Sequence, residues 1–522
     1  MVAAGIMCSR LAGLVRQRTF AHYFGLQSDA ADAFSASFRI PNLLQNLFGE
    51  GALSASFIPV YASLLARGER DLADRVAAAV AGLLALAVSA IVFAGVAATP
   101  LLISLIAPGF AGDKRTLTIH LVRILFPGAG LLVMSAWCLG VLNSHRRFLL
   151  SYMAPVVWNA AMIATLLWFG ASTALPRLAV LLAWGSVAGS ALQFGVQVPF
   201  VLRTAPGLVR GAHGEAAVHV RSVARNFVPV FVSRGVVQIS AYVDTVLASL
   251  LPTGAVTGLT NAQLLYTLPV SLFGMSVSAA ELPAMSGEIG LGASGAEAVR
   301  GRLNAGLRRI AFFVVPSAMA FLALGDVIAG AVLQTGRFTS ADAAYVWGIL
   351  AGSSIGLLAS TLGRLYASTW YALRDTRTPL NFAIVRVVLT TGLGYLFAVP
   401  VPRWLGVAPA WGAAGLTASA GLAGWVEMLL LRASLNARIG ATGLPRALVA
   451  KLWGAATAGA AAAWAVKLLV PARGPMAEAL FTLPAYGAVF GAAALAMRIP
   501  EASDLLGRVL RGGASPPPDA AG

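Results

Sequence analysis

The stretch VAAAVAGLLALAVSAIVFAGVAATPLLISLIA, residues 76–107, decides the class of fold. It contains no charged residue, and it is longer than the roughly 20 apolar residues with which an α-helix crosses a bilayer. It lacks the alternation of apolar and polar residues that is typical of a transmembrane β-strand. This stretch therefore predicts a membrane-spanning helix.

Apolar runs of this kind recur along the whole chain. Of the 522 residues, 58% are hydrophobic and only 11% are charged, whereas about 25% of the residues of a soluble domain are charged. We count fourteen runs, near residues 2–24, 30–66, 76–107, 117–143, 150–172, 176–202, 222–251, 256–288, 305–333, 341–372, 379–400, 406–431, 445–470 and 477–498. The sequence predicts an all-α polytopic membrane protein with 14 transmembrane helices.

The net charge of +17 has a membrane explanation. A soluble protein with this charge would suggest a nucleic-acid partner, but here the basic residues lie mostly between the apolar runs. Every second connection is rich in Arg, and the others are poor in it. By the positive-inside rule the rich set is cytoplasmic, which places both termini in the cytoplasm and leaves no reason to expect nucleic acid.

Landmark residues indicate an internal repeat. Three pairs are each 228 residues apart, namely Pro41 and Pro269, Phe110 and Phe338, and Arg146 and Arg374. With six spans per repeat, the two halves run parallel, and transporters built in this way bind substrate between the halves. The predicted division is a six-helix lobe over 1–212, a pseudo-symmetric six-helix lobe over 213–436, two extra helices over 437–511 and a disordered tail over 512–522.

The first two spans carry an unusual number of ionisable residues, which are costly inside a membrane and usually face a cavity or a partner. Ser9, Gly13 and Arg16 fall on one helical face, with Arg10 at its edge. A cationic face lined by small residues suits an anion-attracting cavity. The alternative, strongest for Arg10, is that the side chain reaches the cytoplasmic headgroups.

Further candidates follow along the chain. Glu50 stands between two glycines that interrupt the second span, where the helix is expected to break. Asp244 and Arg386 lie deep in the seventh and eleventh spans, and we expect them to form a buried ion pair. The alternative is that each has a separate partner.

Covalent chemistry has no support in the sequence. Cys8 and Cys138 lie far apart in apolar segments, and the five histidines show no metal-binding spacing. No phosphate-binding loop or nucleophile elbow is present. We expect neither an enzyme nor a metal or other cofactor.

The segment SRLAGLVRQRTFAHYFGLQSDAADAFSASFRIPNLLQNLFGEGALSASFIPVY, residues 9–61, closely resembles the N-terminal signature of the MurJ/MviN lipid II flippases. These belong to the multidrug/oligosaccharidyl-lipid/polysaccharide exporter superfamily. The matching motifs are Ser-Arg-x-x-Gly-x-x-Arg, Asp-Ala-Phe, Pro-Asn-Leu-Leu and Phe-x-Glu-Gly-Ala. Weaker matches continue at residues 107–110, 336–339 and 375–379, so the resemblance covers the twelve-helix core.

The resemblance implies a function and a site. It implies two lobes around a cationic cavity that opens to each side in turn, carrying lipid II across the bacterial inner membrane for peptidoglycan synthesis and cell shape. The two extra helices would form a groove for the lipid tail. The implied partners are lipid II, membrane lipids and the cell-wall synthesis machinery. By motif, the implied functional residues are Ser9, Arg10, Arg16, Asp32, Asn42 and Glu50.

The chain departs from the family pattern in two places. Gln45 stands where many members have a basic residue, and residues 262–269 lack the Asp, Arg and Glu that many members carry in the eighth helix. Arg234 or Arg364 could replace the lost charge. The alternatives to lipid II flipping are another exporter of the superfamily, acting on drugs or O-antigen, a membrane enzyme acting on the same lipid, and a scaffold for cell-wall machinery.

Overall fold

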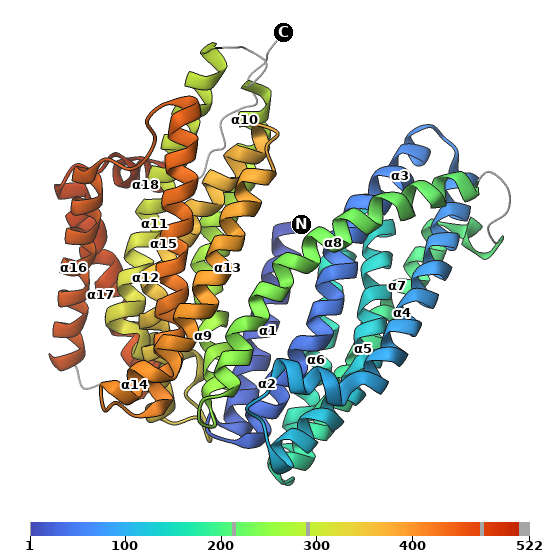
Figure 1. Cartoon of the computed structure of the whole chain (residues 1–522), viewed down its shortest axis with the longest axis horizontal. Coiled ribbons are helices and arrows are strands. Elements are labelled where there is room, and N and C mark those ends of the chain that lie inside the picture. Colours follow the sequence, from blue (N-terminus) through green and yellow to red (C-terminus); the bar gives the residue numbers. More distant parts are fainter. Residues whose placement is uncertain (1, 211–215, 289–292, 470–473, 511–522) are drawn as a thin grey trace. The chain divides into compact units, whose positions relative to one another are not determined.

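The computed structural model describes residues 2–210, 216–288, 293–469 and 474–510, and this part of the chain contains no β-strand (Figure 1). The first helices are α1 (Val2–Phe24), α2 (Asp29–Leu44), η1 (Gln45–Leu53), α3 (Ser54–Ala66), α4 (Arg70–Ile106), α5 (Gly112–Ser144), α6 (Phe148–Phe169), α7 (Leu175–Thr204), η2 (Pro206–Arg210) and α8 (Ala216–Ser249). The remaining helices are α9 (Ala255–Pro269), η3 (Val270–Met275), α10 (Ser276–Glu288), α11 (Ala293–Leu333), α12 (Ser340–Ala372), α13 (Arg377–Ala398), α14 (Pro400–Trp404), η5 (Pro409–Trp411), α15 (Gly412–Ile439), α16 (Arg446–Leu469), α17 (Pro475–Ala496) and α18 (Pro500–Leu510).

The all-helical prediction is confirmed. Ten helices of the described chain are long and apolar enough to cross a membrane. The predicted spans outside these ten are 2–24, 30–66, 150–172 and 222–251. The first of them carries three arginines and the second is broken, so neither forms one long apolar helix. The count of fourteen spans stays a prediction.

The break in the second span takes the form of a π-helical segment. Helix α2 passes into η1 at Gln45, and η1 passes into α3 at Ser54. Extended π-helix is rare and marks positions where the regular ladder of hydrogen bonds is disturbed. The second half repeats this feature, because α9 passes through the π-helix η3 into α10.

The two arginines of one repeat pair end their helices in the same way. Arg146 after α5 and Arg374 after α12 both adopt left-handed conformations, with φ of 60° and 58°. In each case the helix ends in two hydrogen bonds, Arg146 N to Asn143 O and Arg147 N to Leu142 O after α5, and the same pattern after α12. This is the Schellman motif, in which glycine is the usual left-handed residue.

The chain divides into two compact units that differ from the predicted lobes. Unit 1 comprises Met1–Thr257 and Leu333–Asp342, and unit 2 comprises Gly258–Val332 and Ala343–Gly522. Helix α8 therefore packs with unit 1, although the repeat assigns it to the second lobe. The short segment 333–342 also belongs to unit 1. The lobe boundary at 212–213 stays a prediction based on the repeat.

The last two long helices are held to unit 2 at a kink in α11. Leu324 leaves the helical conformation (φ −130°, ψ 18°), which frees carbonyl groups from the helix ladder. The indole of Trp347 in α12 donates to the Leu322 carbonyl at 2.9 Å, and that of Trp464 in α16 donates to the Ala323 carbonyl at 3.0 Å. Helix α17 packs along α16 (Figure 1).

Candidate functional site

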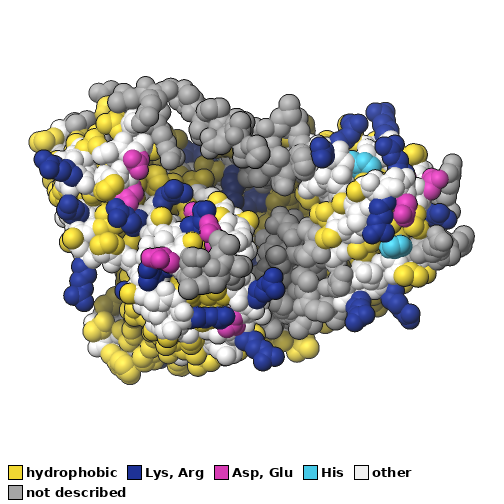
Figure 2. All heavy atoms as spheres, turned by 90° about the horizontal axis from the view of Figure 1, so that it is seen from above, with side chains coloured by type: hydrophobic (Ala, Val, Ile, Leu, Met, Phe, Trp, Pro, Cys, Tyr) yellow, Lys and Arg dark blue, Asp and Glu magenta, His cyan; other side chains and the backbone are white. Residues whose placement is uncertain are grey.

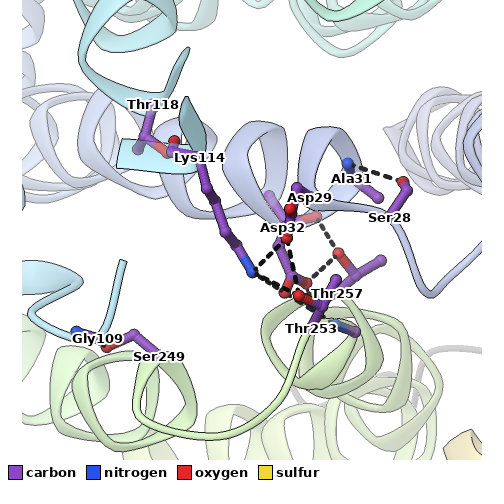
Figure 3. Close-up of polar contacts among 12 residues, drawn as sticks. Ser28, Asp29, Ala31, Asp32, Gly109, Lys114, Thr118, Ser249, Thr253 and Thr257 are labelled. Carbon is purple, nitrogen blue, oxygen red and sulfur yellow. Dashed lines mark hydrogen bonds and ion pairs between the residues drawn. The ribbon is translucent and has the colours of Figure 1, made fainter. Parts of the chain in front are cut away.

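Asp32 lies at the centre of a polar cluster in unit 1 (Figure 3). Ser28 caps the start of α2, since its hydroxyl accepts a hydrogen bond from the Ala31 amide at 3.1 Å. This cap places Asp32 in the first turn, where it is only 1% exposed. A carboxylate buried to this degree requires several partners.

The carboxylate of Asp32 caps another helix, α9. It accepts hydrogen bonds from the backbone amides of Gly254 and Thr257 at 2.9 Å each, and from the Thr257 hydroxyl at 2.8 Å. These amides belong to the N-terminal turn of α9, where backbone donors have no partner within the helix and the helix dipole favours negative charge. Gly254 has φ of +99°, a conformation that other residues rarely adopt.

Lys114 completes the cluster from the first turn of α5. Its ammonium lies 2.8 Å from Asp32, 3.3 Å from Asp29 and 4.4 Å from the centre of the Phe110 ring. The Thr253 hydroxyl donates to Asp29 at 2.8 Å, and this hydrogen bond, together with the Lys114 charge, holds the pKa of Asp29 below its usual value against the opposing effect of burial. We call Asp29, Asp32, Lys114, Thr253 and Thr257 the Asp32 cluster.

Sequence reasoning identified Asp32 but missed the rest of the cluster. Lys114 is one of only three lysines in the chain, which was a usable signal. The run Pro252-Thr253-Gly254 before an apolar stretch is typical of a helix start. Nothing in the sequence indicated that this helix start would lie against Asp32, because the contact joins residues more than 200 positions apart.

The motif at residues 336–339 lies against the end of α1. Gly336 has φ of +54°, and a side chain there would collide with the His22 backbone. Arg337 donates its amide to the His22 carbonyl at 2.8 Å. Thr339 and Asp342 then form a reciprocal capping pair that starts α12. The glycine is thus required for close packing inside unit 1.

Arg16 sits at the end of a ladder of aromatic rings. The rings of Phe20, Phe34, Phe38 and Trp158 follow one another at centroid distances of 5.4–5.5 Å, the first pair tilted and the next two stacked. The Arg16 guanidinium lies 5.4 Å from the centre of the Phe38 ring and 5.0 Å from that of Trp158. Cation–π contacts of this kind hold a cation without neutralising its charge. Arg16 is half-buried, so it stays available to an anionic ligand.

The other predicted residues of the cationic face are placed less closely. Ser9 is half-buried and Arg10 is exposed on α1, and Asn42 is half-buried near the end of α2. The side chains of Glu50 and Arg234 lie outside the described residues. The joint role of the six motif residues stays a prediction.

The structure shows a partner of Arg386 inside its own unit. The Arg386 guanidinium donates to Glu427 of α15 at 3.0 Å, inside unit 2. Asp244 belongs to unit 1, where it lies close enough to Arg39 to act on its charge. The sequence placed Asp244 and Arg386 at suitable depths but could not say which carboxylate would face the guanidinium. Asp244 and Arg386 belong to different units, and their pairing stays a prediction.

Unit 2 also contains an apolar cavity of about 520 Å³. Its wall is formed by η3, α11, α17 and α18. The lining residues include Phe273, Phe312, Phe313, Phe490, Leu505 and Leu506. Gly487 and Gly491 of α17 also face it, and a side chain added at either glycine would meet open space. The cavity therefore has the character of a hydrocarbon-binding groove.

Comparison with solved structures defines the fold. An inward-facing multidrug resistance MATE family transporter of the MOP superfamily has a similar fold, with a TM-score of 0.65 and 16% identity over 82% of this chain and 95% of its own. A lipid II flippase MurJ in an inward closed conformation matches with a TM-score of 0.77 and 22% identity over 97% of this chain and 99% of its own.

The sequence comparisons then identify the family. The family model described as lipid II flippase MurJ matches residues 20–483, and the chain belongs to this family. The lipid II flippase MurJ of Burkholderia cenocepacia is 30% identical over 84% of this chain and 83% of its own length. A probable lipid II flippase MurJ of Rhizobium meliloti is 30% identical over 83% of this chain and 79% of its own.

Proposed function

We propose that this protein flips lipid II from the cytoplasmic to the periplasmic face of the bacterial inner membrane by alternating access. The observation that carries this proposal is the family match over residues 20–483, which includes α2, α5 and the start of α9. Flipping moves a lipid without making or breaking a covalent bond. The chain then acts as a transporter and needs no catalytic residue.

The Asp32 cluster would act as a latch during transport. It joins the first turns of α2 and α5 to the turn before α9 through a nearly buried ion pair and three further hydrogen bonds. These polar contacts are stable while water is excluded from the junction. Once the junction opens, water can replace each partner. A junction of this kind can switch between two states, which alternating access requires.

The cationic face of α1 would bind the diphosphate of lipid II. Arg16 offers a planar guanidinium that matches phosphate oxygens in pairs. Its contacts with Phe38 and Trp158 fix the side chain while leaving its charge uncompensated. Arg10, Ser9 and Asn42 would add to this site, and Glu50 would orient it.

The apolar cavity between α11 and α17 would hold part of the lipid tail. Its aromatic and aliphatic lining suits a hydrocarbon chain, and residues 437–511 contribute α17 and α18 to its wall. The tail would then be bound by unit 2, separately from the cationic face on α1. A second anchoring point of this kind would help to select lipids with long tails.

The charge distribution supports an orientation with both termini in the cytoplasm. In the view of Figure 2, Lys and Arg side chains outnumber acidic ones. By the positive-inside rule such a face lies in the cytoplasm. The protein would then take lipid II from the leaflet in which it is made, and pass it to the cell-wall synthesis machinery outside.

Complementation with a side-specific assay tests the function. The chain is expressed in a bacterium depleted of its own flippase, and lipid II is measured on each membrane face. We expect restored growth and lipid II on the periplasmic face. Growth without movement of lipid II, or export of drugs or O-antigen lipid instead, would contradict the proposal and favour another exporter of the superfamily.

A further inference from the structure

The apolar cavity of unit 2 extends along two helices. On α17 its lining runs from Tyr486 to Leu495, and on α11 it runs from Phe312 to Ala320. At a rise of 1.5 Å per residue, these stretches measure about 13 Å and about 12 Å along the helix axes. The cavity therefore has two ends, and they differ in structure.

The lining offers no free polar group to a ligand. Its two polar side chains are Ser317 and Tyr486, and no residue of the described lining is charged. The Ser317 hydroxyl donates to the Phe313 carbonyl at 2.8 Å, and the Tyr486 hydroxyl donates to the Pro316 carbonyl at 2.6 Å. A polar ligand would lose its hydrogen bonds to water here without replacing them. The chemistry of the lining therefore suits a hydrocarbon chain.

Tyr486 closes one end of the cavity. Its side chain is buried, and the hydrogen bond to α11 fixes the ring across the space between α17 and α11. The ring belongs to a buried cluster with Leu324, Ala460 and Ala463, and these three residues do not line the cavity. They lie beyond the ring, so a chain that reaches Tyr486 meets packed core.

The other end of the cavity lies at α18. Ala502, Leu505 and Leu506 contribute to the lining there, and the two leucines are 44% and 43% exposed. This end therefore reaches the surface of unit 2. The ion pair of Arg308 and Glu501, at 2.7 Å, holds α18 against α11. A chain that enters beside α18 runs along α17 toward Tyr486.

We propose that Tyr486 determines how much of an isoprenoid chain the cavity accepts. The inference rests on the proposed function, because the chain is the tail of the lipid substrate. The ring acts as a fixed end stop, positioned by the Pro316 carbonyl and by the buried cluster behind it. Each methylene group buried in the cavity adds affinity, whereas chain beyond the filled cavity adds none. The cavity then rejects chains too short to fill it and holds one fixed length of longer chains.

Binding of isoprenoid alcohols to the purified full-length protein tests this role. The probes, in order of length, are farnesol, geranylgeraniol, solanesol and undecaprenol, all measured in the same detergent. For the wild type, affinity should rise with length and then level off at the chain that fills the cavity. Tyr486→Ala opens the closed end, so levelling should move to a longer chain. The longest probe should then gain at least about fourfold in affinity over wild type, the effect of one further buried methylene group.

Gly487→Leu should shift the length dependence in the opposite direction. Gly487 lines the cavity next to Tyr486, and a side chain added there would meet open space. The leucine would occupy the closed end, so affinity should level off at a shorter chain. This variant tests the end stop even if Tyr486→Ala fails to fold, which thermal unfolding establishes.

Two further variants separate the end stop from a general loss of packing. Tyr486→Phe keeps the ring and loses only the hydroxyl, so it should retain the wild-type length dependence with a slightly lower unfolding temperature. Tyr395→Ala is the matched control, because Tyr395 is an exposed tyrosine of α13 outside the lining. Its length dependence should equal that of the wild type.

Three outcomes would overturn the inference. One is a wild-type affinity that rises through undecaprenol without levelling. Another is levelling at the same length in Gly487→Leu, Tyr486→Ala and wild type. The third is equal binding of oleyl alcohol and geranylgeraniol, which would mean that the cavity takes the acyl chain of any membrane lipid. Transport of lipid II by the reconstituted wild type is measured separately. Absence of transport together with the expected length shifts would contradict the flippase function alone.

Discussion

Thr257 donates two hydrogen bonds to Asp32, one from its backbone amide at 2.9 Å and one from its hydroxyl at 2.8 Å. The two residues lie in the first turns of α9 and α2, helices that are separated by more than 200 residues of chain. One buried carboxylate thus serves as the N-terminal cap of a distant helix. This arrangement makes the Asp32 cluster sensitive to the loss of a single charge.

Asp32→Asn should destabilise the protein. The amide keeps the shape of the carboxylate, but its NH₂ group cannot accept from the α9 amides, and Lys114 loses its buried partner. Removing one member of a buried pair costs about 3–5 kcal/mol. Thermal unfolding in detergent measures the effect. Asp113→Asn, at an exposed acid next to Lys114, is the control and should change nothing. Equal unfolding temperatures for the two variants would contradict a buried latch.

A disulfide across the same junction should stop transport. The hydroxyl oxygens of Ser35 and Thr257 are 3.2 Å apart, so cysteines at both positions should form a disulfide on oxidation. Cys8, which is exposed, is replaced by serine in this background. We expect flipping to stop on oxidation and to return on reduction. Flipping by each single cysteine variant should not change on oxidation. If the oxidised double variant still flips lipid II, the junction stays closed during transport and the latch is contradicted.

Arg16→Ala should abolish flipping while the protein still inserts and folds. The lost contact with phosphate is charge-assisted and worth about 1.5–3 kcal/mol. Trp158→Leu should have a smaller effect in the same direction, because it removes a cation–π contact worth about 0.5–2 kcal/mol and leaves the charge in place. Side-specific measurement of lipid II compares the two. If cells that express Arg16→Ala at the native level grow normally, Arg16 does not bind the substrate phosphate. Its role is then contact with the headgroups of the membrane lipids.

Gly491→Leu should fill the apolar cavity and slow flipping. A side chain at this position meets open space, so the leucine can enter the cavity without displacing the backbone. The unfolding temperature should stay the same or rise, because leucine has a higher helix propensity than glycine. Gly392→Leu on α13 is the control, because Gly392 is exposed and also has open space around it. If the Gly491→Leu protein flips lipid II at the normal rate, the lipid tail does not bind in this cavity.

His145 should make stability depend on pH. Burial lowers the pKa of His145 below 6.5, assisted by Arg70 and Arg147 and opposed by Asp74. The unfolded chain therefore takes up a proton near pH 6.5 while the folded protein does not. Stability should be full above that pH and fall as the pH drops toward the lower folded value.

The histidine variant separates this effect from other titrations. His145→Gln removes the titrating ring, and its unfolding temperature should vary less between pH 7 and pH 5 than that of the wild type. Tyr61, whose hydroxyl lies 3.0 Å from the His145 ring, keeps a polar neighbour in this variant. His120→Gln, at an exposed histidine, should leave the slope unchanged. An identical slope for His145→Gln and wild type would contradict the assignment.

Local features of the chain were sufficient to predict much of this molecule. Long apolar runs such as residues 76–107 determine membrane helices because no other structure satisfies the backbone in lipid. The repeat spacing that links Arg146 with Arg374 is present in the sequence, and both residues end their helices in the same left-handed turn. The motifs in residues 9–61 were specific enough to indicate the family that the comparisons identified.

Only the tertiary structure decided which polar groups meet. Asp32 was a candidate by motif, but its partners Lys114 and Thr257 are set by how α2, α5 and α9 pack. Arg386 pairs with Glu427 of α15, a partner that the sequence did not indicate. Hydrophobic periodicity places a charge at a depth and on a face of its own helix. It carries no information about the rotation of the neighbouring helix, which is settled by the packing of side chains across the whole interface.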